Sequence, residues 1–125
     1  MDKTSSKILI VDDAPDFCES LAWLLNDEGY KCRVAGNGQQ AIDLLGAERP
    51  NLILLDWEMP VMNGLEFLTK RSRVASLRSI PVLVLSAAVN IEKSATALKA
   101  SFLQKPLDYL GLLSRMKSLL ATQPA

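Results

Sequence analysis

The sequence Asn51-Leu52-Ile53-Leu54-Leu55-Asp56-Trp57-Glu58-Met59-Pro60 joins a run of apolar residues to a carboxylate. Four consecutive Leu and Ile residues predict a strand buried on both faces, as in parallel sheets. The run ends at Asp56, and an ionised carboxylate beside a buried strand needs partners that compensate its charge. Because ligands bind at the carboxyl ends of strands in open α/β sheets, Asp56 is a candidate reactive group.

Four more segments have strand character. Lys7-Ile8-Leu9-Ile10-Val11 and Pro81-Val82-Leu83-Val84-Leu85 are apolar and predict buried strands. From Tyr30 to Ala35, apolar Tyr30, Cys32 and Val34 alternate with Lys31 and Arg33, which predicts a strand near an edge of the sheet. A short strand is predicted at residues 101–104.

The segments between these strands have helical spacing. Asp13 is expected to cap a helix that carries Pro15 in its first turn and ends at Gly29. A second helix is expected from the cap Asn37 to about Ala47. Further helices are predicted from residues 63–64 onward, at about 91–99 and at about 108–121.

The third of these helices should be amphipathic. Leu65, Phe67 and Leu68 are its apolar residues, and its basic residues Lys70, Arg71 and Arg73 are expected to face solvent. Strands that alternate with helices five times predict an α/β fold, a doubly wound (βα)5 sandwich with a five-stranded parallel sheet. We expect one domain over residues 1–125, ordered from about 6 to 121.

Composition excludes several functions. Lys plus Arg and Asp plus Glu number 14 each, so bulk charge favours no nucleic-acid partner. The apolar runs are too short for a membrane span, and residues 1–6 lack a signal-peptide core, which favours the cytoplasm. Cys18 and Cys32 are expected to be reduced, buried thiols. The chain has no histidine, which excludes phosphohistidine chemistry within it.

Polar residues follow four of the five strands: Asp12 and Asp13, Asp56, Ser86, and Lys105. In a parallel sheet these ends lie side by side, so the residues are expected to converge. Three carboxylates together repel one another, and a hard divalent cation such as Mg²⁺ relieves that repulsion. Taken singly, the residues have ordinary structural explanations: a helix cap, a strand-end turn residue and a solvated lysine. As a set, they predict a site that holds a phosphoryl group on a carboxylate.

At these residues the chain resembles the receiver domain of two-component response regulators over essentially its whole length. The matching motifs are Ile10-Val11-Asp12-Asp13, Asp56-Trp57-Glu58-Met59-Pro60-Val61-Met62-Asn63-Gly64, Leu85-Ser86-Ala87 and Lys105-Pro106. The resemblance implies the flavodoxin-like strand order 2-1-3-4-5. It also implies that Asp56 accepts the phosphoryl group from a histidine kinase or a histidine phosphotransfer protein.

The same resemblance implies roles for the other site residues. Asp12, Asp13, Asp56 and the Glu58 backbone carbonyl would hold Mg²⁺. Ser86 and Lys105 would contact the phosphoryl group, with a cis peptide before Pro106. Ser86 and Phe102 would be the switch residues. The segment from Ser86 to Lys105 is shorter than is usual in the family, which affects the expected output face and not the site.

Three alternatives remain open. An aspartate-nucleophile phosphatase of the haloacid dehalogenase type needs two aspartates separated by one residue, which Asp12-Asp13-Ala14-Pro15 does not provide. A flavin-binding module would need a phosphate loop rich in Ser and Thr after the first strand. A degenerate receiver acting only as a docking module would not need the acidic, hydroxyl and lysine set. The chain is either a free-standing regulator or the receiver of a longer protein.

Overall fold

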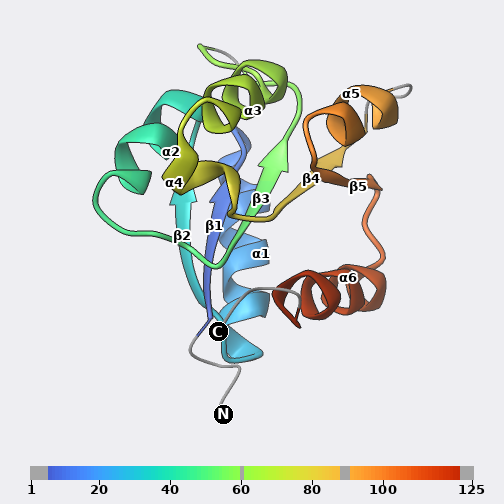
Figure 1. The fold of residues 1–125 in the computed structure, drawn as a ribbon. Coiled ribbons are helices and arrows are strands. Elements are labelled where there is room, and N and C mark those ends of the chain that lie inside the picture. Colours follow the sequence, from blue (N-terminus) through green and yellow to red (C-terminus); the bar gives the residue numbers. More distant parts are fainter. Residues whose placement is uncertain (1–5, 60, 88–90, 122–125) are drawn as a thin grey trace.

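A computed structural model describes residues 6–59, 61–87 and 91–121. Five strands form one sheet in the order β2-β1-β3-β4-β5, and every pair is parallel (Figure 1). The predicted sheet and its order are confirmed. The strands are β1 Lys7–Val11, β2 Lys31–Ala35, β3 Leu52–Asp56, β4 Val82–Ser86 and β5 Ser101–Gln104.

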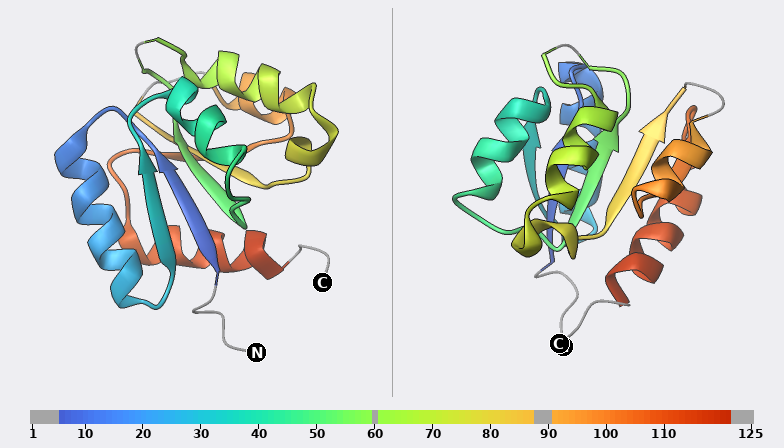
Figure 2. Two further views of the ribbon diagram at one scale, coloured as in Figure 1. Left: turned by 90° about the vertical axis from the view of Figure 1, so that its left-hand side faces the viewer. Right: turned by 45° about the horizontal axis from the view of Figure 1, so that its top comes forward.

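Helices cover both faces of the sheet (Figure 2). They are α1 Pro15–Asp27, α2 Gly38–Leu45, α3 Gly64–Ser72, α4 Ala75–Arg78, α5 Glu92–Ala97 and α6 Tyr109–Ala121. Alternate residues of the central strands point to opposite sides, because the side-chain period of a strand is two. One core cluster therefore joins the strands to α1 and α6, and the other joins them to α2, α3 and α5. None of the helices in the described residues combines the length and apolar character needed to span a membrane.

The register aligns the carboxyl ends of the strands. Val11 pairs with Leu55, Asp56 with Leu85, and Ser86 with Gln104. The residues that follow β1 and β5 therefore come out at the same edge as Asp56 and Ser86. This edge is the one at which the sequence places its polar residues.

The helix starts agree with the sequence in part. Asn37 caps α2 by accepting a bond from the Gln40 amide at 2.9 Å, and Asn63 caps α3 in a reciprocal capping box with Glu66. The expected cap at Asp13 is wrong. The N-cap of α1 is Ala14, because Pro15 takes the first helical position and the Ala14 amide donates to the Asp12 carboxylate instead.

The edge strand and the two thiols follow the prediction except at Val34 and Cys32. β2 is an edge strand, as expected, but Val34 is exposed although it alternates in phase with buried Tyr30. An edge strand is covered less completely than its neighbours, so its apolar phase is only partly buried. Cys18 and Cys32 are both free thiols; Cys18 is buried and Cys32 only partly.

The expectation for Arg71 is wrong, since this residue is only 3% exposed. Arg71 lies three residues after buried Leu68, four after Phe67 and seven after Gly64, so the helical period places it on the inward face of α3. The residue type alone predicted an exposed side chain, but the position of Arg71 on the helix places it in the core. The short helix α4 was also not predicted.

Candidate functional site

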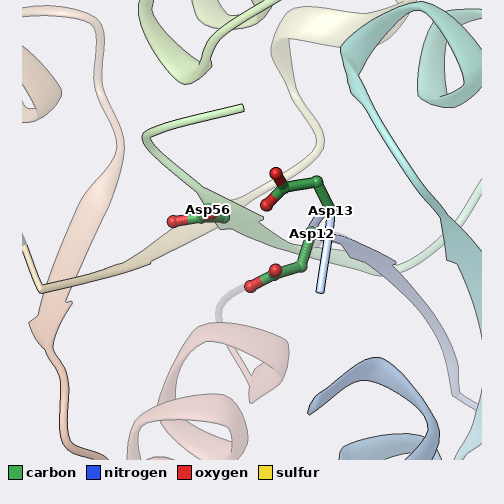
Figure 3. Close-up of side chains that lie close together, drawn as sticks. All are labelled: Asp12, Asp13 and Asp56. Atoms are coloured by element: carbon green, nitrogen blue, oxygen red, sulfur yellow. The ribbon is translucent and has the colours of Figure 1, made fainter. Parts of the chain in front are cut away.

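Three carboxylates converge at the carboxyl edge of the sheet (Figure 3). One carboxylate oxygen each of Asp12, Asp13 and Asp56 lies within 4.8 Å of the others. Asp12 and Asp13 directly follow β1, and Asp56 ends β3. Asp12 is 4% exposed, Asp56 is partly buried and Asp13 is exposed. The structure thus brings together the acidic residues that the sequence scatters.

Both oxygens of Asp12 have partners within the protein. The Ala14 amide donates to Oδ1 at 2.9 Å, and the ammonium of Lys105 donates to Oδ2 at 3.0 Å. These two bonds compensate the buried charge of Asp12. They also leave Asp13 and Asp56 as the carboxylates more available for direct contact with a metal ion.

Lys105 reaches the site from the end of β5. Its Nζ lies 4.1 Å from the centroid of the Phe17 ring, and its side chain is 23% exposed. Its amide donates to the Ser86 carbonyl at 2.9 Å, which joins β5 to β4 at this edge. Ser86 is buried, and the Lys105–Pro106 peptide is cis.

The surroundings of Asp56 disfavour the ionised form of its carboxyl group. Burial and, next, the charge of Asp12 raise the pKa of Asp56 to about 6 from its ordinary value of 3.8, although Lys105 and the Glu58 amide oppose the rise. The ionised form of Asp56 is therefore held at a cost. A hard divalent cation among these oxygens would remove that cost, and the donor set fits Mg²⁺.

The loop after β3 packs closely on the site. A side chain at Gly64 would place its Cβ 2.9 Å from the Trp57 Cα and 3.1 Å from the Asp56 carbonyl oxygen, so only glycine allows this approach. Glu58 is exposed, and its amide bonds to Asp56. Trp57 is partly buried and borders an open pocket with Glu58, Met59 and Asn63.

Phe102 lies within β5 and not at the carboxyl end of that strand. It pairs with Val84, two residues before the strand ends, and packs against the core cluster on the α5 side. Its carbonyl accepts a bond from Arg115 of α6 at 3.3 Å. The side chain of the predicted switch residue thus packs on the α5 side of the sheet, while its backbone carbonyl is bonded to α6.

Sequence reasoning missed two neighbours of the site. Phe17 faces Lys105, and the Cys18 thiol donates to the Asp12 carbonyl at 3.2 Å. Both lie in the first turn or so of a helix that starts directly after the aspartates. Their nearness to Asp12 and Asp13 in the sequence was the available signal.

Comparison with known proteins gives the family. Residues 8–117 match the model of the response regulator receiver domain. An uncharacterised 14.6 kDa protein of Leptolyngbya boryana is 37% identical over 109 residues, covering 85% of this chain and 83% of that protein. The response regulator MprA of Mycolicibacterium vanbaalenii is 35% identical over 117 residues, and the chain spans 50% of its length.

Solved structures agree. The signal receiver domain of a signal transduction histidine kinase from Syntrophus aciditrophicus superposes with a TM-score of 0.88 at 31% identity, covering 97% of this chain and 96% of that one. The response regulator TrrA of Thermotoga maritima, solved in complex with Mg²⁺-BeF, gives a TM-score of 0.82 at 28% identity over 92% of this chain and 99% of that one. On its sequence match and its fold, the chain belongs to the family of response regulator receiver domains.

Proposed function

We propose that Asp56 accepts a phosphoryl group from the phosphohistidine of a histidine kinase or a histidine phosphotransfer protein. The observation that carries this is the convergence of three carboxylates and Lys105 around the end of β3. Asp56 is the only member of the acidic cluster that ends a central strand. Phosphorylation would then switch the conformation of the domain and so control an output.

The chemistry is a transfer between two nucleophiles. A carboxylate oxygen of Asp56 attacks the phosphorus, the phosphorus–nitrogen bond of the donor breaks, and the imidazole leaves with that electron pair. The donor histidine lies outside this sequence, which contains no histidine. The signal ends by hydrolysis: water attacks the phosphorus and releases inorganic phosphate from Asp56. The chain catalyses only these two reactions on itself.

The acidic cluster would hold Mg²⁺. Asp13, Asp56 and the Glu58 backbone carbonyl would bind the ion directly, and Asp12 would act through water because both of its oxygens are already engaged. When bound, the ion neutralises negative charge on the phosphoryl oxygens. TrrA, with its bound Mg²⁺-BeF, supports this assignment by resemblance.

Ser86 and Lys105 would contact the phosphoryl oxygens. The hydroxyl and the ammonium are both donors, and both belong to strand ends next to Asp56. Their movement toward the phosphoryl group would shift the ends of β4 and β5, and Phe102 of β5 would respond as the switch residue on the α5 side of the sheet. We propose that the domain acts in the cytoplasm, controls a downstream target and does not bind nucleic acid directly.

The alternatives have less support. A docking module without phosphorylation would not need the intact set of three carboxylates, a buried serine and a lysine. A haloacid dehalogenase phosphatase would need an aspartate two residues after its nucleophile on the first strand, where this chain has Asp12-Asp13-Ala14.

Labelling tests the proposal. Incubation with Mg²⁺ and acetyl phosphate is expected to add one phosphate per chain, measured by intact-protein mass spectrometry, and none when EDTA is present. Reduction of the acyl phosphate with borohydride, followed by peptide mapping, should place the modification at Asp56. Modification at Asp12 or Asp13 instead would contradict the assignment.

Substitution of the metal ligands gives a second prediction. Asp13→Ala should weaken Mg²⁺ binding at least tenfold, because no group in the described part of the chain occupies the Asp13 oxygens, and Asp12→Asn should weaken it less. The emission of Trp57 in a Trp23→Phe background reports the titration, since Trp57 borders the site and Trp23 is 69% exposed on α1. Asp16→Ala is the control, as Asp16 is an exposed acid in the first turn of α1. Equal Mg²⁺ affinity in Asp13→Ala and wild type would show that Asp13 is no ligand.

A further inference from the structure

The ring of Phe17 contacts the ammonium of Lys105 on one side. Nζ of Lys105 lies 4.1 Å from the centroid of Phe17, well inside the range of a cation–π contact. Phe17 stands four residues after Asp13 in α1 and packs against the core cluster that joins α1 and α6 to the sheet. The ring is thus anchored by the core while its face meets the ammonium.

The lysine needs such a second partner. Its stem has four flexible carbons, and the bond to Asp12 Oδ2 at 3.0 Å restrains the ammonium from one side only. With a side chain that is 23% exposed, Lys105 has solvent within reach. The ring of Phe17 removes part of that freedom before any phosphoryl group arrives.

The same contact tolerates movement toward Asp56. Cation–π attraction extends to about 6 Å from the ring centroid, so Nζ can shift by about 2 Å and keep the ring. Asp56 offers an oxygen within 4.8 Å of the Asp12 carboxylate, which already binds Lys105. A short movement therefore exchanges Asp12 for a phosphoryl oxygen on Asp56. A hydrogen bond to Asp12 cannot follow that movement, but a contact with a ring face can.

We propose that Phe17 is a positioning residue that holds Lys105 at the site and guides its ammonium from Asp12 to the phosphoryl group. This inference rests on the proposed function of Asp56 and adds to it a residue that does not touch the phosphoryl group. It predicts that removal of the ring weakens the binding of a phosphoryl mimic, and that this effect depends on the presence of Lys105.

The contact itself is tested without any phosphoryl group. In protein labelled with ¹³C-lysine, the ring current of Phe17 should shift the Lys105 Cε protons upfield, with Lys105→Ala identifying the signal. Phe17→Leu should abolish the shift, Phe17→Tyr should keep it, and Trp23→Leu should leave it unchanged. Trp23→Leu is a matched control, since it exchanges an exposed aromatic residue of the same helix for leucine. A Lys105 signal without this shift in wild type would overturn the inference.

The function of the contact is tested with beryllofluoride and Mg²⁺. Phe17→Leu should bind the mimic about three- to tenfold more weakly, and Phe17→Tyr within about twofold of wild type. In a Lys105→Ala background, Phe17→Leu should cause no further loss, because the ring acts through the lysine. Circular dichroism checks folding, and Phe17→Met, which keeps volume without a ring, replaces the leucine variant if that one unfolds.

The outcomes separate the two proposals. Suppose that wild type binds beryllofluoride and that Phe17→Leu lowers the affinity by the same factor with and without Lys105. The ring then has only a structural role and the inference fails. Unchanged affinity in Phe17→Leu overturns it as well. If wild type with Mg²⁺ binds no beryllofluoride, the proposed function of Asp56 fails and the guiding role fails with it.

Discussion

The Asp56→Asn protein is expected to incorporate no phosphate from acetyl phosphate and Mg²⁺, a loss of at least a hundredfold in rate. The amide of asparagine has nearly the shape of the carboxylate but is not a nucleophile toward phosphorus. Asp12 cannot replace it, because its oxygens are bonded to the Ala14 amide and to Lys105. Intact-protein mass spectrometry after a fixed incubation measures the result.

The control for this experiment is Asp16→Asn, which changes an exposed carboxylate on α1 and should be labelled like wild type. Labelling of Asp56→Asn at the wild-type rate would show that another residue accepts the phosphoryl group. The proposed function would then be wrong, whatever the geometry of the acidic cluster.

The same variant should be more stable than wild type without Mg²⁺. Since burial and Asp12 raise the pKa of Asp56 to about 6 in the folded protein, its ionised form opposes folding above that pH. The full shift corresponds to about 3 kcal/mol, which solvent screening of a partly buried group reduces to about 1–2 kcal/mol. Urea unfolding in EDTA should show this gain at pH 7.5, and the gain should vanish as the pH falls from 6 to below 4.

The sheet and the site could both be predicted because strands that are buried on both faces are recognisable in the sequence. Strands buried on both faces leave continuous apolar runs such as 52–55 and 82–85, and the residue after each run must lie at the carboxyl edge. Parallel pairing then aligns those edges, so Asp12, Asp56 and Lys105 could be placed together without any knowledge of the helices.

The larger departures from the prediction lie on the helices. The inward face of α3 contains Arg71, and the start of α1 moved by one residue because Pro15 fixed it there. The contact between Lys105 and Phe17 depends on how α1 packs against the sheet. No local sequence pattern predicts that packing. Residue type predicts burial on average, while packing decides it for each side chain.

Arg71→Ala is expected to lower the free energy of unfolding by about 3–5 kcal/mol, a large share of the stability of a domain of this size. The buried guanidinium makes four hydrogen bonds to three backbone carbonyls of the described residues. Nε and Nη2 donate to Ile80 at 3.1 and 2.7 Å, Nη2 to Arg78 at 3.1 Å, and Nη1 to Leu98 at 3.3 Å. Truncation removes the donors from the buried carbonyl of Ile80 and from the partly buried carbonyls of Arg78 and Leu98.

The Leu98 carbonyl links this prediction to the segment between Ser86 and Lys105. Leu98 is the C-cap of α5, and the next residue, Lys99, has a φ of 61°, a conformation that favours glycine. The bond from Arg71 holds the turn that carries the chain from α5 into β5. In Arg71→Ala this turn should open locally, and the Ala100 amide, which donates to Ala95 at 2.9 Å, should exchange its hydrogen faster than in wild type.

Two variants distinguish the contribution of the guanidinium hydrogen bonds to stability from those of charge and of helix propensity. Arg71→Lys keeps the charge but loses the planar fork that serves three carbonyls at once, so it should recover less than half of the stability. Arg73→Ala, an exposed arginine two residues along, should change the free energy of unfolding by less than about 0.5 kcal/mol. Urea unfolding of the four proteins measures these differences. If Arg71→Ala and Arg73→Ala proved equally stable, the hydrogen bonds of Arg71 would contribute nothing, and another contact would have to hold the turn before β5.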